Sequence, residues 1–242
     1  MVARLIWVAF LMTVLAVPVR GEGVFELERG QMIQAIKHDV ISTSRAIGKN
    51  RLDSAVFEVM GRIPRHEFVP PSQQRHAYEN RPLAIGYGQT ISQPYIVALM
   101  TDILDLEPSD TVLEIGTGSA YQAAVLGELV ENVFTIEIIP ELGKQARQRL
   151  QRLGYSNVEV RIADGYYGWE EHAPFDAILV AAAASQVPPP LIRQLKPGGK
   201  MIIPVGAPFS VQHLLLISKE AEGAVRSRQV LPVAFVPLTG GH

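Results

Sequence analysis

The fold of this 242-residue chain is decided by the stretch Thr111-Val-Leu-Glu-Ile-Gly-Thr-Gly-Ser-Ala-Tyr-Gln122. The apolar run at 112–115 predicts a buried strand, and two glycines follow it almost directly. From Ser119 onward the apolar residues recur at helical spacing. A strand, a tight glycine turn and a helix N-terminus together form a place where a nucleotide-like ligand can approach bare backbone.

The spacing of these glycines favours one class of ligand over another. A dinucleotide-binding turn, G-x-G-x-x-G, needs a small third residue at position 121, which is occupied by the bulky Tyr121. The pattern E-x-G-x-G-x-G is common in S-adenosylmethionine-dependent methyltransferases. It fits Glu114, Gly116 and Gly118, with Ala120 in place of the third glycine. A glycine turn alone is weak evidence, because a plain strand-to-helix turn has the same composition.

Two further acidic residues stand at the ends of the next two predicted strands. Glu137 ends the strand at 132–137, about twenty residues after the glycine turn, where a carboxylate can accept hydrogen bonds from ribose hydroxyls. Asp164 and Gly165 follow the strand at 158–162, where a carboxylate can accept from an adenine amine, although Asp-Gly is also a common turn. Because parallel strands end at the same edge of a sheet, these residues predict a ligand crevice there.

The composition excludes several other kinds of site. The net charge of −2 gives no sign of a nucleic-acid-binding surface. The chain has no cysteine, which excludes thiol nucleophiles, disulfides and cysteine-ligated zinc. The six histidines are scattered, with no H-E-x-x-H motif, so we expect no metal site.

The N-terminal segment 1–21 has the pattern of a secretory signal peptide. Arg4 precedes an almost wholly apolar run at 5–17, and small residues near Gly21 could form a cleavage site. The run is short for a membrane span, which needs about 20 apolar residues. Alternatively, the start codon is assigned too early and translation begins at Met32.

The remaining chain predicts an α/β protein. Helices are expected within 31–61, where Asp53 can cap a second helix, and again from Pro94. Lys196 to Gly199 is expected to form a turn. The alternation of helices and strands predicts a doubly wound, mostly parallel, Rossmann-like sheet of seven strands that ends in an antiparallel strand or two. The seven predicted strands are 111–115, 132–137, 158–162, 175–181, 199–204, 213–218 and about 228–236.

Taken together, the motifs of the chain resemble the protein-L-isoaspartate O-methyltransferase family. The likeness covers about 32–239, and its most specific part is the loop Ile85-Gly-Tyr-Gly-Gln-Thr-Ile-Ser-Gln-Pro94. Two departures are Ala120, where the family usually has glycine, and the extra apolar segment at the N-terminus. The other matching stretches are Arg62–Val69, Ala77–Asn80, Leu113–Ser119, Asp164–Gly165, Ala173–Ala177, Leu195–Gly199 and Phe235–Thr239.

The resemblance implies a class I methyltransferase fold and transfer of a methyl group from S-adenosylmethionine to the free α-carboxyl of an L-isoaspartyl residue. The resulting ester closes to a succinimide, whose hydrolysis regenerates some normal aspartate. The resemblance makes Ser92 the catalytic residue, isoaspartyl peptides and proteins the partners, and the chain a monomer without nucleic acid or metal. It assigns the cofactor to Thr90, Ile91, Glu114, Gly116, Gly118, Ser119, Glu137, Asp164, Gly165 and Thr239.

The resemblance also divides the chain into three parts. Residues 1–21 are the signal-like segment, 22–110 carry the N-terminal helices and the active-site loop, and 111–242 form the cofactor-binding core. Since S-adenosylmethionine is made and kept in the cytosol, we favour cytoplasmic function over export to the periplasm or anchoring through 5–17.

Several residues have a second interpretation. Ser92 could instead be a helix N-cap just before Pro94. Glu114 could bond backbone amides beneath the cofactor, or simply bridge two strands. Tyr78 and Tyr87 could line a substrate groove or be merely packed.

Two other functions also fit parts of the chain. A small-molecule methyltransferase would explain the glycine turn and Glu137 but not the loop at 85–94. A non-catalytic exported binding module would explain Ala120 and the segment at 1–21, but not an intact Ser92.

Overall fold

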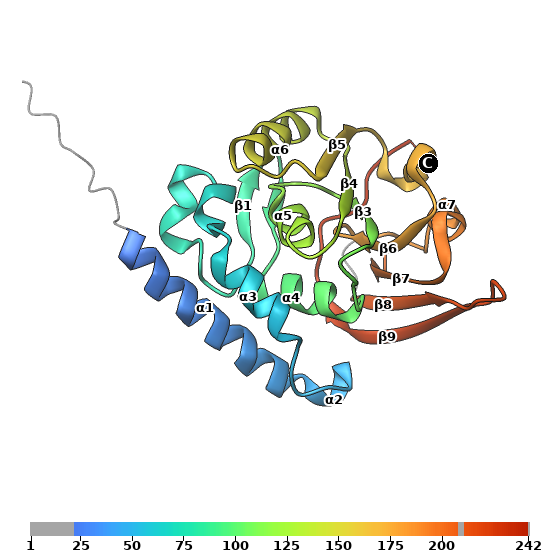
Figure 1. Cartoon of the computed structure of the whole chain (residues 1–242), viewed down its shortest axis with the longest axis horizontal. Helices are drawn as coiled ribbons and strands as arrows, with labels where there is room; N and C mark the ends of the chain where they lie inside the picture. The colour runs from blue at the N-terminus through green and yellow to red at the C-terminus, as the bar shows by residue number, and fades with distance from the viewer. Residues whose placement is uncertain (1–21, 208–210, 242) are drawn as a thin grey trace, which may run out of the picture.

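The protein, described here from a computed structural model, contains a seven-stranded sheet with helices on both faces (Figure 1). The structure describes residues 22–207 and 211–241, so the signal-like segment at 1–21 lies outside it. The strand order is β5-β4-β3-β6-β7-β8-β9. The first five strands are mutually parallel, β8 pairs antiparallel with β7, and β9 pairs antiparallel with β8. The strands are β3 (Thr111–Ile115), β4 (Asn132–Glu137), β5 (Val158–Ile162), β6 (Phe175–Val180), β7 (Leu195–Val205), β8 (Gln212–Lys219) and β9 (Val225–Val233).

The alternation of side chains along each strand divides the core into two layers. Val112, Val133 and Ala177 pack into the cluster that includes the N-terminal helices, whereas the neighbouring residues Leu113 and Ile178 pack into the other. Because the central parallel strands are covered on both faces, they are apolar almost without interruption.

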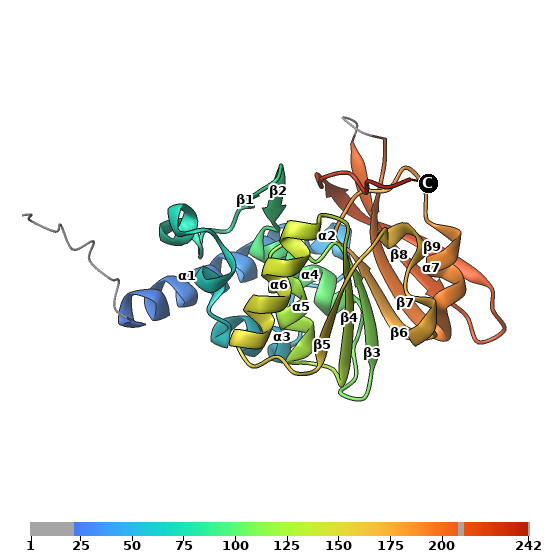
Figure 2. The same cartoon turned by 90° about the horizontal axis from the view of Figure 1, so that it is seen from above.

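The helices are distributed over these two faces, and Figure 2 shows α4, α5 and α6 together on one side of the sheet with α7 on the other. The long helix α1 lies outside α3 and α4 (Figure 1). The helices are α1 (Glu22–Ser42), α2 (Ser44–Ile47), α3 (Ser54–Arg62), α4 (Pro94–Ile103), α5 (Tyr121–Gly127), α6 (Pro140–Arg152) and α7 (Pro189–Gln194).

The expected fold is confirmed, with two local differences. The loop at 85–94 contains a separate two-stranded sheet, in which β1 (Leu83–Gly86) pairs antiparallel with β2 (Gln89–Ile91). The connection between them is tight because Gly86, Tyr87 and Gly88 all have positive φ angles, of 94°, 54° and 71°. The expected turn at Lys196–Gly199 is instead an irregularity within β7, where pairing with β6 shifts register.

Helix boundaries follow the capping residues that the sequence suggested. The Asp53 side chain accepts a hydrogen bond from the Ala55 N–H at 2.8 Å, so it caps α3 as expected. Pro94 and Pro140 each occupy the first turn of a helix. In the part of the chain that the structure covers, no helix is both long enough and apolar enough to cross a membrane.

Candidate functional site

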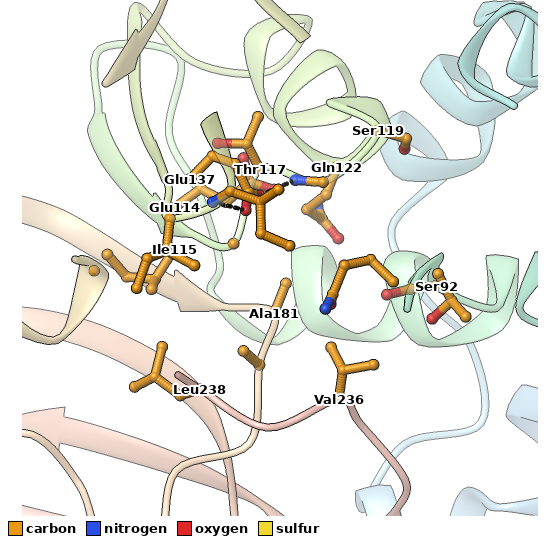
Figure 3. Close-up of a pocket in the computed structure, with 18 of the residues that line it drawn as sticks. Ser92, Glu114, Ile115, Thr117, Ser119, Gln122, Glu137, Ala181, Val236 and Leu238 are labelled. Carbon is orange, nitrogen blue, oxygen red and sulfur yellow. Dashed lines mark hydrogen bonds between the residues drawn. The ribbon is translucent and has the colours of Figure 1, made fainter. Parts of the chain in front are cut away.

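A cavity opens at the carboxyl edge of the sheet, where the strand order reverses between β4, β3 and β6 (Figure 3). Its walls are the glycine turn after β3, the end of β4, the residues after β6, the β2 strand and the C-terminal segment 236–239. Most of the predicted site residues meet there, although they are scattered along the sequence. Those that line the cavity are Thr90, Ile91, Ser92, Glu114, Gly116, Gly118, Ser119, Glu137, Gly165 and Thr239.

The glycine turn presents bare backbone to this cavity. Gly116 and Gly118 have φ angles of 92° and 51°, which favour glycine over residues with a side chain. Ala120 also has a positive φ, of 68°, but it is buried and does not line the cavity. The departure from the family pattern at Ala120 therefore strains the backbone locally and does not narrow the cavity.

The Glu137 carboxylate organises this turn. One of its oxygens accepts the Gly118 N–H at 2.7 Å, and the other accepts the Ile139 N–H at 2.9 Å (Figure 3). A carboxylate offers about four acceptor positions, so these two bonds leave capacity for hydroxyl donors. Glu137 can therefore support the turn and bind a diol at the same time.

Glu114 lies beneath the cavity and is completely buried. Its Oε2 accepts the Thr135 hydroxyl at 2.5 Å, and Thr135 in turn lies 2.6 Å from the Thr117 hydroxyl. Because Thr135 belongs to β4, the bond links two strands, and the strand-bridging interpretation is correct. Burial in this apolar layer is the largest influence on Glu114 and raises the pKa of its carboxyl to about 8.

Asp164 is placed differently from the other predicted residues. Its side chain is outside the lining of the cavity and accepts the N–H groups of Tyr166, at 3.0 Å, and Gly241, at 3.1 Å. Of the predicted Asp-Gly pair, only Gly165 lines the cavity. In this structure the Asp164 carboxylate therefore stabilises a turn and the C-terminal segment.

Ser92 follows β2 at the edge of the cavity (Figure 3). The N-cap of α4 is Gln93, which makes no side-chain capping bond, so the N-cap interpretation of Ser92 is wrong. That function belongs to Asn80, whose side-chain oxygen accepts the Tyr95 N–H at 3.0 Å. No hydrogen bond among the described residues involves the Ser92 hydroxyl, which is consistent with a role toward a ligand.

The backbone of Ser92 is held by a residue that the sequence did not single out. Arg65 is fully buried and donates from Nη2 to the Ser92 carbonyl at 2.7 Å and from Nε to the Ala77 carbonyl at 2.8 Å. Its guanidinium carbon also lies 4.6 Å from the centre of the Tyr121 ring. Burial lowers the pKa of Arg65 to about 10, so the side chain stays charged at neutral pH.

The two tyrosines named from the sequence do not reach the cavity. The Tyr78 hydroxyl lies 2.8 Å from Nδ1 of His66 within a packed cluster. Tyr87 is at the tip of the β1–β2 hairpin and is 54% exposed. The cavity is also lined by residues to which the sequence analysis gave no role, among them Gln89, Thr117, Gln122, Ala181, Val236 and Leu238.

A second cavity, of about 680 Å³, lies next to the first. The two share Thr90, Ser92, Ala181 and Val236. One wall of this groove comes from the ends of α1 and α4, and the opposite wall is the apolar segment 231–236. Ser92 therefore lies where the cavity at the strand ends meets an open groove.

This arrangement of two adjoining cavities suits transfer between two bound molecules. Among residues 22–207 and 211–241, no group of three or more His, Asp or Glu side chains could hold a metal ion. The site offers backbone amides, a hydroxyl and apolar walls, with carboxylates at the ends of the strands.

Comparisons with known proteins agree with this geometry. The sequence model of the family "Protein-L-isoaspartate(D-aspartate) O-methyltransferase" matches residues 35–242. A protein-L-isoaspartate O-methyltransferase 2 of Syntrophobacter fumaroxidans is 63% identical over 214 residues, which cover 88% of this chain and 87% of the relative. A protein of the same name from Polaromonas sp. is 65% identical, with 86% and 99% covered.

A solved structure from Plasmodium falciparum shares the fold. It is described as a putative protein-L-isoaspartate O-methyltransferase in complex with S-adenosyl-L-homocysteine. The TM-score is 0.72 at 24% identity, and the match covers 87% of this chain and 98% of the other.

The buried Glu114 predicts a pH-dependent stability. Its pKa in the folded protein, about 8, lies above the value of 4.5 for an exposed glutamate, so the folded state holds the proton more tightly than the unfolded chain does. Its contribution to stability is complete below pH 4.5 and is lost as the pH rises towards 8. We expect Glu114→Gln, which cannot ionise, to become more stable relative to wild type, by on the order of a few kcal/mol, between about pH 5 and about pH 9. Urea unfolding of both proteins across this range measures the difference, and a constant difference would contradict the prediction.

Proposed function

The chain belongs to the protein-L-isoaspartate(D-aspartate) O-methyltransferase family, and we propose that its reaction takes place where the two cavities meet at Ser92. The family activity is methylation of isoaspartyl residues for protein repair, with S-adenosylmethionine as the methyl donor. The observation that carries the proposal is that one serine borders both a cavity at the strand ends and a groove open to a peptide.

The residues at the strand ends fit the donor in chemistry and shape. Two glycines with positive φ leave the turn after β3 without side chains, so a ligand can reach the backbone closely. Glu137 has acceptor capacity for the ribose hydroxyls, and Ile138 and Ile139 supply apolar surface beside it for the adenine ring. When bound, the donor supplies a methyl group on a positively charged sulfur, which is a good leaving group.

The chain's own task is then to position a carboxylate. An aspartyl-type carboxyl has an ordinary pKa near 4 and is already ionised at neutral pH, so the reaction needs no strong base. Arg65 fixes the backbone at Ser92 through its carbonyl, which leaves the hydroxyl to hold an oxygen of the substrate. In this proposal Ser92 orients the carboxylate in line with the methyl group, and Ile91 and Val236 help to exclude water.

The adjoining groove is the proposed site of the damaged peptide. An isoaspartyl linkage lengthens the main chain by one methylene and leaves a free α-carboxylate, so recognition can rely on backbone rather than side chains. Of the segment 233–238, residues 233–236 border the groove together with Thr90, Ser92 and Gln93 of the loop at 85–94. Main-chain groups there that make no bond within the chain can offer hydrogen bonds to an extended peptide. We also propose that the enzyme acts as a monomer on isoaspartyl peptides and proteins, without nucleic acid or metal.

We propose that two parts of the chain contribute different portions of the site. Residues 22–110 provide the hairpin, Ser92 and one wall of the groove, and residues 111–242 provide the cofactor-binding cavity and the other wall of the groove. The donor is made in the cytosol, so we place the function there. N-terminal sequencing of the protein from cell fractions tests this placement, and a mature chain that begins near Glu22 in a periplasmic fraction would contradict it.

One prediction concerns the binding of the cofactor by Glu137. We expect Glu137→Gln to raise the dissociation constant for S-adenosylmethionine roughly ten- to a hundred-fold, because it loses about 1.5–3 kcal/mol of charge-assisted hydrogen bonding. Isothermal calorimetry measures the change. Glu141→Gln is a matched control, since it removes the same charge from an exposed residue in the first turn of α6. Equal affinities for wild type and Glu137→Gln would rule out this role.

The second prediction concerns Ser92. We expect Ser92→Ala to lower kcat by about a hundred-fold while it leaves the affinity for the donor and the melting temperature nearly unchanged, because positioning acts mainly in the transition state. Single-turnover assays, calorimetry and thermal unfolding give the three values. A fall in the melting temperature together with kcat would instead indicate a structural role.

The experiment that tests the function compares isoaspartyl peptides with aspartyl peptides of the same sequence. Using radiolabelled donor, we expect methylation of isoaspartyl peptides of varied sequence, with rates within about a factor of a hundred, and none of their aspartyl twins. Comparable rates on both forms would reject the proposal. Methylation of small carboxylic acids alone would favour a small-molecule methyltransferase.

A further inference from the structure

Among the residues that the structure describes, a single charged side chain lines the groove next to Ser92. The described residues that border it are otherwise neutral at ordinary pH, and most of those on the 231–236 side are apolar. The exception is Asp39, which belongs to the last turn of α1. We propose that Asp39 selects isoaspartyl peptides that carry a cationic side chain close to the damaged residue, and disfavours those with an acidic one. This inference rests on the proposed function of the groove.

The Asp39 carboxylate is held in place by two side-chain amides, one of which belongs to the active-site loop. Its Oδ2 accepts the Asn80 side-chain amide at 2.8 Å and the Gln93 side-chain amide at 3.4 Å. Gln93 directly follows Ser92, so the carboxylate lies one side chain away from the proposed reaction centre. Both donors are neutral amides, which orient the carboxylate without cancelling its charge.

The carboxylate also remains accessible to a ligand. The Asp39 side chain is 31% exposed, and it borders the groove together with Thr43 and Tyr95. The nearest ionisable partner is His38, whose Nδ1 lies 3.6 Å from Oδ1, but the His38 side chain is 83% exposed and does not line the groove. A negative charge at a half-buried position next to apolar walls is screened less than one on an open surface.

The charge acts on the peptide in two opposite ways. A lysine or arginine beside the isoaspartyl residue gains an attraction to Asp39, whereas a glutamate at the same place meets a repulsion. The ratio of kcat/KM between lysine and glutamate peptides combines both effects and should be about tenfold, as expected for a partly exposed ion pair and its like-charge counterpart. The neutral backbone contacts proposed for the groove would not produce such a ratio.

Asp39 could instead have only a positioning role, because Asn80 also caps α4 through the Tyr95 N–H. The substitution Asp39→Asn separates the two roles. An asparagine keeps an oxygen that can accept from Asn80 and Gln93, but it carries no charge. A purely structural role would lower the activity on all peptides alike or leave it unchanged.

The test uses three isoaspartyl peptides that differ only in having lysine, glutamine or glutamate at one flanking position, first on one side of the isoaspartyl residue and then on the other. Initial rates are measured with full-length enzyme at about pH 8, where histidine side chains are ordinarily neutral. We expect wild type to prefer lysine over glutamate by about tenfold on at least one side, and raised salt to reduce the preference. In Asp39→Asn the ratio should fall to within about twofold.

A control variant, Glu131→Gln, changes the net charge equally at an exposed residue just before β4, at the opposite edge of the sheet, and should keep the wild-type ratio. The same lysine-to-glutamate ratio in wild type and Asp39→Asn would overturn the inference, and so would an equal loss of activity on all three peptides. If wild type methylates isoaspartyl peptides without any charge preference, only this inference fails. If it methylates none of them, the proposed function fails as well.

Discussion

The reversal of strand order at β3 is the constraint on which the site depends. β3 pairs in parallel with β4 on one side and with β6 on the other, so the connections that leave these strands turn away from each other at the carboxyl edge. A crevice results at this edge. The glycine turn after β3 and Glu137 at the end of β4 border this crevice because the parallel register brings their strands to an end at the same level.

The crevice becomes a closed site only through segments far away in the sequence. The C-terminal residues 236–239 reach it because Ala183, just beyond β6, exchanges backbone hydrogen bonds with Val236 and Leu238. The β1–β2 hairpin reaches it from the opposite side, and the buried Arg65 holds the carbonyl of Ser92 there. A buried charged side chain is costly unless it is bonded, and the bonds from Nε and Nη2 join the segments that carry Ala77 and Ser92. The guanidinium therefore joins separate segments of the N-terminal part through hydrogen bonds, as strand pairing joins separate segments of the core.

The strand register and the contacts between distant segments explain which features could be predicted from the sequence. The predicted bounds of β3, β4 and β5 agree with the structure, because their apolar residues mark buried strands even where polar residues such as Glu114, Thr135 and Arg161 interrupt them. Glu137 could be found because its function depends on a position at a strand end. Arg65 and Asn80 could not be identified from the sequence, because their hydrogen-bond partners lie 27 and 15 residues away and are brought close only by the tertiary fold.

Val236 and Leu238 are ordinary apolar residues, and no local pattern distinguishes a residue that lines a cavity from one that packs in the core. Asp164 was correctly placed at a strand end, yet the direction of its side chain follows from contacts with a C-terminal segment that the local pattern does not show.

The distribution of charge in the site suits the chemistry of the family. Methyl transfer from a sulfonium to a carboxylate starts from one positive and one negative charge and ends with neutral products, so an apolar, water-poor site favours the dispersal of charge in the transition state. A fixed ion close to the reacting atoms would stabilise one reactant and oppose this dispersal. Around Ser92 the structure places Ile91, Ala181 and Val236, which are neutral. The carboxyl of the buried Glu114 has its pKa raised by burial, so that it holds its proton up to about pH 8. The other carboxylates stand at the margins instead, where Glu137 borders the cavity at the strand ends and Asp39 borders the adjoining groove. The same fold thus keeps its permanent charges for recognition and leaves the place of reaction nearly free of them.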